Sequence, residues 1–95
     1  MISLFKMFGK SMEPVLKEND IVLVKKSRSL KNLVCFKMAD KFMCKRLRRV
    51  EEGGLFVEGY NPKSIDSRLF GLVPFEDMIG YPFAIIYPFE RMRLL

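Results

Sequence analysis

The sequence predicts a mostly β fold: a compact single domain of antiparallel, coiled or partly closed β-sheet with short helical turns. Runs rich in β-branched and aromatic residues are short, turn-forming residues separate them, and only two short segments suit a helix. The 95 residues are 49% hydrophobic and 29% charged, which suits one globular domain over residues 1–95 and excludes a disordered chain.

The first half of the chain contains three predicted strands. Asp20 to Lys25 is β-branched between polar ends, which predicts a strand buried on both faces. After a basic loop from Ser27 to Asn32, two strands are predicted at Leu33 to Met38 and Lys41 to Val50. Ala39-Asp40 forms the tight turn that would join these two strands.

The second half alternates turns and strands in the same way. Glu51 to Gly54 is a turn that leads into a strand at Leu55 to Glu58, and Asn61 to Ser64 is a loop. Ile79 to Tyr87 is a β-rich run in which Pro82 and Pro88 indicate an edge or a bulge. The two helical candidates are Met12 to Leu16 and Pro74 to Met78.

The two cysteines are informative through their spacing. With a two-residue turn Cys35 faces Cys44, whereas a three-residue loop would place Cys35 opposite Lys45. A disulfide is therefore geometrically possible, but in a cytoplasmic setting we expect two semi-buried thiols. Two cysteines and no histidine argue against a zinc site.

The chain is basic, with a formal net charge of +6. This excess suits nucleic acid, anionic lipid or an acidic peptide, and a solvated basic surface without a partner is the commoner meaning. No stretch approaches the roughly 20 apolar residues that span a bilayer. The run from Met1 to Phe8 is too short for this and lacks a signal cleavage site, so we expect a cytoplasmic protein, although a removed anchor would leave the same sequence.

Lys45 is the candidate general base, because the chain has no histidine and a hydroxyl nucleophile then needs another base. Side chains alternate along a strand, so Met43, Lys45 and Leu47 share one apolar side, while Cys44, Arg46 and Arg48 share the other. Lys45 is thus the cation expected to point inward, where burial would lower its pKa. The pattern alone favours the alternative, in which Lys45 is one of several cations in a solvated basic run.

Ser11 is the candidate nucleophile. It lies in a turn with Gly9, Met12 and Pro14, and such a serine more commonly caps a short helix. In the functional interpretation the bend exposes the hydroxyl and turns backbone N–H groups toward the same space. These groups would then stabilise the oxyanion that forms when a peptide carbonyl is attacked.

A third segment combines Ser64, Asp66, Ser67 and Arg68. By itself it predicts a salt bridge between Asp66 and Arg68 that ties down a loop. The order of the three segments adds information: the chain resembles the signal peptidase I family of serine/lysine proteases, over nearly its whole length.

The resemblance rests on three ordered motifs. Ser11 to Val24 matches the pattern Ser-Met-x-Pro-x-Leu-x-x-Gly-Asp-x-Val-x-Val, and Lys45-Arg46 matches the Lys-Arg strand. Gly59 to Val73 matches Gly-Asp-Asn, a short loop and Ser-x-Asp-Ser-Arg-x-x-Gly-x-Val. The last residues, from Ile79 to Leu95, are similar to the family's final strands.

The resemblance implies a role for each matched residue. Ser11 would be the nucleophile, with its backbone N–H as an oxyanion donor, and Lys45 the general base. Ser64 would hydrogen-bond and orient the lysine, and Asp66 with Arg68 would form a supporting ion pair. Some family members supply a second oxyanion donor from a serine at the position of Gly9, which has no hydroxyl. No cofactor is implied.

Four departures limit this transfer. Asn19 replaces a glycine, which is mild because asparagine tolerates positive φ. Tyr60 replaces the aspartate of Gly-Asp-Asn, and the loop Asn61 to Ser64 is one residue short. The membrane anchor and a large accessory insertion are missing. A short chain without these two parts is similar to the small peptidases that mature nickel-type superoxide dismutase.

The implied partner is a precursor protein or peptide, docked as an extended strand, with small side chains next to the scissile bond. The rival within the class is a signal peptidase that lacks its anchor here or contacts the membrane through Met1 to Phe8. Two other classes remain open: a basic β-domain that binds single-stranded nucleic acid, which we do not expect, and a catalytically dead peptide binder. Self-cleaving repressors share the chemistry, but no DNA-binding helices precede Ser11 and their pattern lacks Ser-x-Asp-Ser-Arg.

Overall fold

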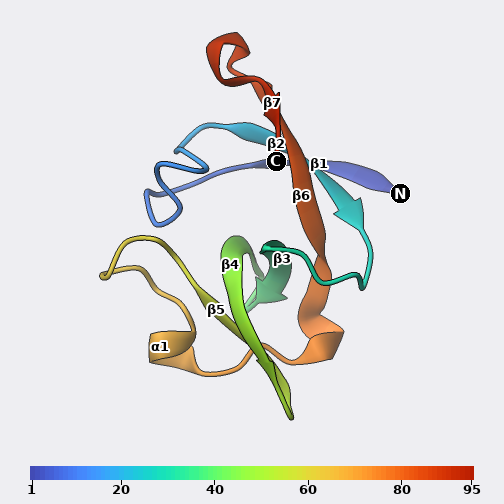
Figure 1. The fold of residues 1–95 in the computed structure, drawn as a ribbon, viewed down its shortest axis with the longest axis vertical. Coiled ribbons are helices and arrows are strands. Elements are labelled where there is room, and N and C mark those ends of the chain that lie inside the picture. Colours follow the sequence, from blue (N-terminus) through green and yellow to red (C-terminus); the bar gives the residue numbers. More distant parts are fainter.

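The computed structural model, which describes residues 1–95, confirms the expected mostly β fold. Seven strands form one antiparallel sheet that does not close (Figure 1). The strand order is β1-β2-β6-β3-β4-β5, and β7 pairs with β6. The strands are β1 Ile2–Lys6, β2 Ile21–Lys26, β3 Leu33–Met38, β4 Lys41–Glu51, β5 Gly54–Glu58, β6 Met78–Tyr87 and β7 Arg93–Leu94.

The long strand β6 joins the two halves of the sheet. Its first residues pair with β3, and most of its length pairs with β2. Figure 1 shows β6 running along the molecule, with β1 and β2 beside one part and β3 to β5 beside the other. The β2–β6 register shifts between Leu23 and Val24, opposite Pro82, which confirms the expected bulge.

The β3–β4 hairpin has the two-residue register. Ala39 and Asp40 both have positive φ, 49° and 66°, as a tight turn between twisted strands requires. Cys35 consequently pairs with Cys44, with their Cα atoms 4.3 Å apart. The expectation of two semi-buried thiols is wrong: both cysteines are fully buried and form a disulfide, because the turn places them face to face.

Two hydrophobic cores lie on opposite faces of β3. Leu33 and Cys35 belong to the first core, with Met7, Met12, Leu16, Val22, Val24, Cys44 and Ile85. Val34 and Phe36 belong to the second core, with Leu55, Val57, Val73 and Met78. Because successive side chains of a strand point in opposite directions, β3 is buried on both faces and separates the two cores.

The helical elements are short. The second expected helix exists as the 3-10 turn η1 Phe75–Asp77, and a further turn, η2 Phe89–Arg91, follows β6. The first expected helix, Met12 to Leu16, is wrong: the segment forms turns, because Pro14 lacks an N–H and restricts the residue before it. The helix α1 Ser67–Phe70 was not predicted, and neither was strand β1.

Strand β2 is less buried than the sequence indicates. Val22 and Val24 are buried, but Ile21 and Leu23 are only half-buried, so the expectation of burial on both faces is wrong. The reason is that the first core covers one face of β2 alone. None of the helices is long and apolar enough to cross a membrane.

A buried ion pair ties the C-terminal turn to the loop between β1 and β2, residues 7–20, which we call the Ser11 loop. Asp20, 1% exposed, accepts hydrogen bonds from Arg91 Nε at 2.8 and 3.1 Å and from Arg91 NH2 at 2.9 Å. Arg91 and Arg93 also donate to the Val15 carbonyl. Burial raises the pKa of the Asp20 carboxyl, but these arginines and the Lys17 N–H more than offset this and hold it below its usual value.

We predict that Arg91→Leu lowers the free energy of unfolding by about 3 kcal/mol, since it leaves a buried carboxylate without its partner. Urea denaturation of both proteins measures this change. Arg48→Leu is the matched control: Arg48 is exposed and pairs with Glu58 at 3.3 Å, so its loss should cost about 1 kcal/mol or less. Equal losses in the two variants would contradict the role given to Arg91.

Candidate active site

Ser11 and Lys45, far apart in the sequence, are in direct contact. The Lys45 Nζ lies 2.6 Å from the Ser11 Oγ, within hydrogen-bond distance. Ser11 is half-buried in its loop, and Lys45 is 4% exposed on β4. The two candidate residues that the sequence singled out are therefore brought together.

Lys45 points inward, as the alternation of β4 predicts. It pairs across the hairpin with Val34, and its strand neighbours Met43 and Leu47 pack against the second core. Burial lowers the pKa of the Lys45 ammonium, the nearby Asp66 raises it and Arg68 lowers it again, with a net lowering from 10.5. A lysine in this environment loses its proton more readily than an exposed one.

Core packing and backbone hydrogen bonds together fix the position of the Ser11 turn. The neighbouring Met12 and the more distant Leu16 are fully buried in the first core. The Ser11 carbonyl accepts hydrogen bonds from the backbone N–H groups of Tyr60 at 2.6 Å and Asn61 at 3.3 Å. The segment after β5 thus holds the main chain of the serine at its place beside Lys45.

Gly59 allows this close approach. A Cβ at this position would lie 2.7 Å from the Ser11 carbonyl oxygen and 2.6 Å from the Ser64 Oγ, closer than such atoms can pack. Only glycine fits without moving one of these neighbours. Sequence reasoning placed Gly59 in a matched motif but gave it no role.

Several backbone N–H groups around Ser11, among them those of Lys10 and Met12, have no hydrogen-bond partner within the chain. The Ser11 N–H has no hydrogen-bond partner within the chain, so it is available to a ligand. Gly9 has φ +78°, a conformation that favours glycine, and its N–H faces Glu18 Oε2 at 3.3 Å. Met12 and the exposed Pro14 shape the turn without offering a side-chain donor.

Ser64, Asp66 and Arg68 form a hydrogen-bonded cluster under β5. The Ser64 Oγ donates to Asp66 at 2.6 Å and accepts from Arg68 NH2 at 3.0 Å. Arg68 also donates to both carboxylate oxygens of Asp66, at 3.0 and 2.6 Å, so the expected ion pair is present. Ser64 makes no hydrogen bond to Lys45, in contrast to the expectation, because its hydroxyl is occupied by this pair.

Asp66 is the centre of this cluster. It is fully buried, begins α1 by accepting the Arg68 N–H, and also accepts the Gly59 N–H at 2.9 Å. Burial raises the pKa of the Asp66 carboxyl, but the hydrogen bonds from Arg68, Ser64 and Gly59 outweigh it and keep the pKa well below its usual range. Asp66 is therefore an anion that acts on Lys45 and a support for the segment that holds Ser11.

Ser67 is a structural residue that the sequence did not identify as such. Its buried hydroxyl accepts the Val57 N–H at 2.8 Å and joins α1 to β5. Nothing in a single sequence distinguishes it from its neighbour Ser64.

A cavity of about 500 Å³ opens beside the pair. Ser11, Lys41 and Lys45 line it together with six apolar residues: Phe5, Met7, Phe8, Phe42, Met43 and Cys44. These residues come from the end of β1, the Ser11 loop and the β3–β4 hairpin. The sequence showed no sign of this cavity, since its walls come from segments that only the fold brings together.

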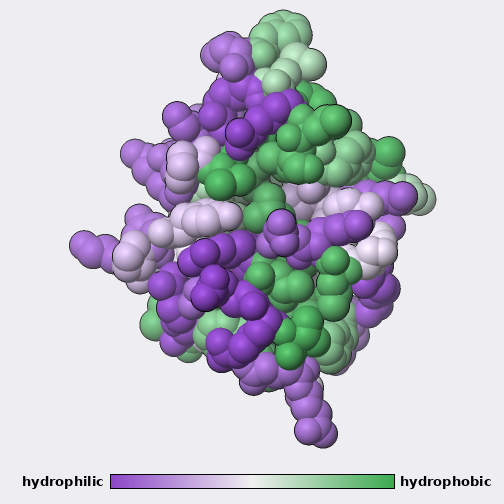
Figure 2. Space-filling model, viewed as in Figure 1, coloured by the Kyte–Doolittle hydropathy of each residue, from purple (hydrophilic) through white to green (hydrophobic).

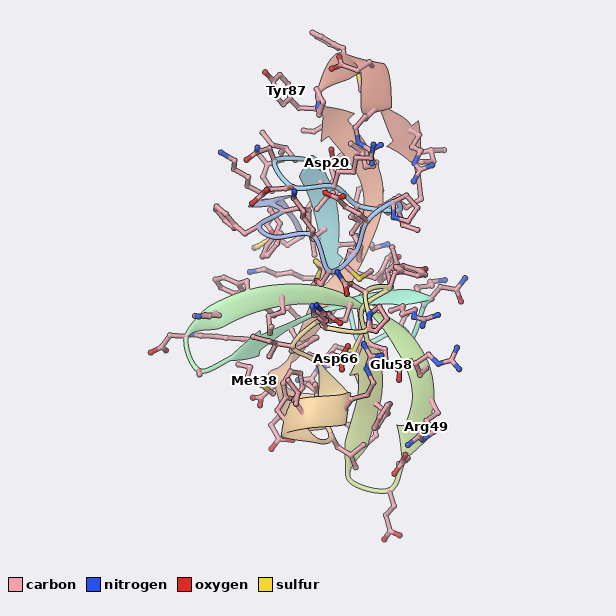
Figure 3. All side chains as sticks on the ribbon, turned by 90° about the vertical axis from the view of Figure 1, so that its left-hand side faces the viewer. Asp20, Met38, Arg49, Glu58, Asp66 and Tyr87 are labelled. Carbon is pink, nitrogen blue, oxygen red and sulfur yellow. A yellow bond between two sulfur atoms is a disulfide. The ribbon has the colours of Figure 1, made fainter.

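The basic residues of β4 are largely paired. Glu58 lies within 3.5 Å of Arg46 and 3.3 Å of Arg48, and Arg49 pairs with Glu51. Figure 2 shows hydrophilic residues gathered over β4 and β5 on this face of the molecule. In Figure 3 the labelled Asp66 and Glu58 lie near one another, on the part of the molecule that contains α1. This distribution argues for a salt-bridged surface and against a row of free cations.

A family described as Peptidase S24-like matches residues 2–72. The matched range includes Ser11, Lys45 and the whole segment from Ser64 to Arg68. This match agrees with the sequence motifs at the level of a serine peptidase, and it specifies neither the signal peptidase subfamily nor a substrate. No curated protein matches the chain.

We predict that Lys45→Met raises the free energy of unfolding at pH 7 by about 1–2 kcal/mol, because it removes a buried ionisable group. The folded-state pKa of Lys45 is below its unfolded value of 10.5. At a pH between these two pKa values, the unfolded chain therefore binds more protons than the folded chain does. The wild-type protein should therefore gain stability as pH rises through this interval, and its difference from the variant should narrow.

Urea titrations at several pH values between 7 and 10 measure that difference. Lys37→Met, at an exposed position of β3, is the control and should follow the wild-type curve. A gap between Lys45→Met and wild type that does not change with pH would contradict the assigned burial of an ionisable lysine.

Proposed function

The chain belongs to the Peptidase S24-like family and is a serine peptidase at that level, and we propose that it is an endopeptidase with a Ser11/Lys45 dyad. The observation that supports the dyad most directly is the 2.6 Å contact between the Ser11 Oγ and the buried Lys45 Nζ. Histidine, the usual base beside a serine nucleophile, is absent from the chain.

The proposed reaction begins with neutral Lys45. Lys45 takes the proton of the Ser11 hydroxyl while the Ser11 Oγ bonds to the carbonyl carbon of the scissile peptide. The carbonyl oxygen becomes an oxyanion, and the Ser11 N–H, which has no partner within the chain, would donate to it. When the intermediate collapses, the C–N bond breaks and the leaving amine receives the proton from Lys45.

A water molecule then completes the cycle. Lys45 removes a proton from the water, whose oxygen bonds to the acyl carbon, and the second intermediate expels Ser11. The proton returns to the Ser11 Oγ, and the product carboxylate leaves. Both halves of the reaction require Lys45 without its proton, which its lowered pKa favours.

The substrate is proposed to bind as an extended strand along β4. Strand β5 pairs with β4 only from Arg46 onward, so Lys41 to Lys45 have no strand partner on that side. An unpaired strand edge offers backbone donors and acceptors to a peptide. This edge leads directly to Lys45 and borders the apolar cavity, so a peptide there would bring its carbonyl to the dyad.

At a finer level, we propose that the enzyme removes an N-terminal leader from a precursor protein. The support is the resemblance to signal peptidase I in the three motifs. The shortened Asn61 to Ser64 loop makes the nickel-type superoxide dismutase precursor the first substrate to assay. An anchored signal peptidase is the second candidate, favoured by the exposed apolar residues Ile2, Leu4 and Phe8.

We predict that Ser11→Ala lowers kcat by about 10⁴-fold or more and Lys45→Met by about 10²–10⁴-fold, since they remove the nucleophile and the base. Release of fragments from peptide mixtures, followed by mass spectrometry, measures this activity. Ser29→Ala and Lys25→Met change exposed residues and should retain wild-type rates. Cleavage that survives in Ser11→Ala would overturn the dyad.

The wild-type kcat/KM should rise with pH as Lys45 loses its proton, and Arg68→Gln should move this rise to higher pH. Arg68 lowers the Lys45 pKa directly, and it also compensates the charge of Asp66, which raises that pKa. Loss of Arg68 therefore raises the Lys45 pKa for both reasons. The pH profile of kcat/KM measures the displacement. Arg48→Gln, an exposed partner of Glu58, should leave the profile in place, and an unmoved profile in Arg68→Gln would contradict this electrostatic role.

A further inference from the structure

The cavity beside the dyad has the form of a side-chain pocket. It is lined by both Ser11 and Lys45, so a group that enters it belongs to a residue immediately next to the scissile bond. One wall is formed by Phe5, Met7 and Phe8, and the opposite wall by Phe42 and Met43 of the hairpin. Figure 3 shows the β3–β4 hairpin projecting from the body of the sheet, with Met38 labelled in it.

The size and lining of this pocket suit a large apolar group. A volume of about 500 Å³ lies in the range of small-ligand sites, and an alanine methyl would leave most of the aromatic wall in contact with water. Phe8 is 74% and Phe42 is 55% exposed, so a bound apolar group would remove aromatic surface of both residues from water. Phe5 and Phe42 meet edge to face with ring centroids 6.3 Å apart, so residues of β1 and of the hairpin contact each other in the lining.

The rim of the pocket is positively charged. Lys41 lines it, the Lys6 Nζ lies 6.0 Å from the Phe8 ring centroid, and the Lys37 Nζ lies 5.9 Å from the Phe42 centroid. These lysines are exposed and carry no salt bridge. Alternate side chains of an extended peptide point to the same side, so a substrate with an acidic side chain two residues before its apolar one would complement both the wall and the rim.

We propose that this pocket selects a leucine, methionine or phenylalanine directly on the acyl side of the scissile bond, with an acidic residue two positions before it. The proposal rests on the endopeptidase function and gives it a substrate class. This class differs from the substrates with small side chains that the resemblance implies. The reason is that three phenylalanines and a methionine (Phe5, Phe8, Phe42 and Met43) line a space that a small side chain does not fill.

Acetyl tripeptide aldehydes provide the test. Their aldehyde carbon replaces the scissile carbonyl and forms a reversible hemiacetal with a serine hydroxyl. The residue that carries the aldehyde is alanine, leucine or phenylalanine, and the first residue of the tripeptide, two positions before it, is glutamate or lysine. Dissociation constants are measured for the wild-type protein and for Ser11→Ala, in which only non-covalent binding remains.

In both proteins the leucine and phenylalanine aldehydes should bind about tenfold or more tightly than the alanine aldehyde. Peptides with glutamate two residues before the apolar residue should bind more tightly than those with lysine there, and this difference should shrink as salt is added. Phe42→Ala should abolish the preference for the large side chain. Phe89→Ala, which removes an equally large and 78% exposed ring on η2, should leave the preference intact.

The outcomes separate the pocket from the chemistry. Equal or tighter binding of the alanine aldehyde in Ser11→Ala, or an unchanged preference in Phe42→Ala, overturns the pocket. If the preference is present but wild type binds no aldehyde more tightly than Ser11→Ala does, the pocket stands and the nucleophile assigned to Ser11 fails.

Discussion

The contact between Ser11 and Lys45 is the interaction on which the rest of this structure depends. A lysine that is 4% exposed is costly to keep charged, and in this fold apolar residues are buried on both sides of β4 around it. The second core supplies the apolar neighbours of Lys45, and the first core anchors Met12 beside Ser11. Strands β3 and β4 lie between the two cores, so both the burial of Lys45 and the position of Ser11 depend on them.

Two buried carboxylates fix the segments on either side of this contact. Asp20, with Arg91, closes the Ser11 loop at its far end, and Asp66, with Arg68, holds the segment after β5 that binds the Ser11 carbonyl. Each carboxylate is almost inaccessible and each has an arginine that compensates its charge. Such pairs contribute little net stability but are destabilising when one partner is lost, so they favour a single arrangement of the loops they join.

The same electrostatics connects structure with reactivity. Asp66 and Arg68 act on the Lys45 pKa in opposite directions, and burial exceeds both, so the lysine is adjusted by a neutral pair and not by a single charge. Ser64 is joined to this pair through its hydrogen bonds to Asp66 and Arg68. Because Gly59 has no side chain, Ser64 and the Ser11 turn can both lie close to its backbone.

The sequence by itself determined the features that depend on neighbours along the chain. Strand alternation placed Lys45 among apolar neighbours, although the pattern alone favoured a solvated cation, and the two-residue turn at Ala39-Asp40 was one of two possibilities, the one that pairs Cys35 with Cys44. Motif order also indicated that Ser11, Lys45 and the segment around Asp66 belong to one site. It could not decide whether the cysteines would bond, since the expectation there rested on the cellular compartment.

Only the tertiary structure decided what depends on distant segments. The Asp20–Arg91 pair, the partners of Ser64 and the cavity between Phe8 and Phe42 join residues whose approach is set by how β6 connects the two halves of the sheet. Local rules of periodicity and turn formation reach only a few residues in each direction, so they identify the groups but not the distances between them. The fold supplies those distances by packing two cores against the opposite faces of one strand.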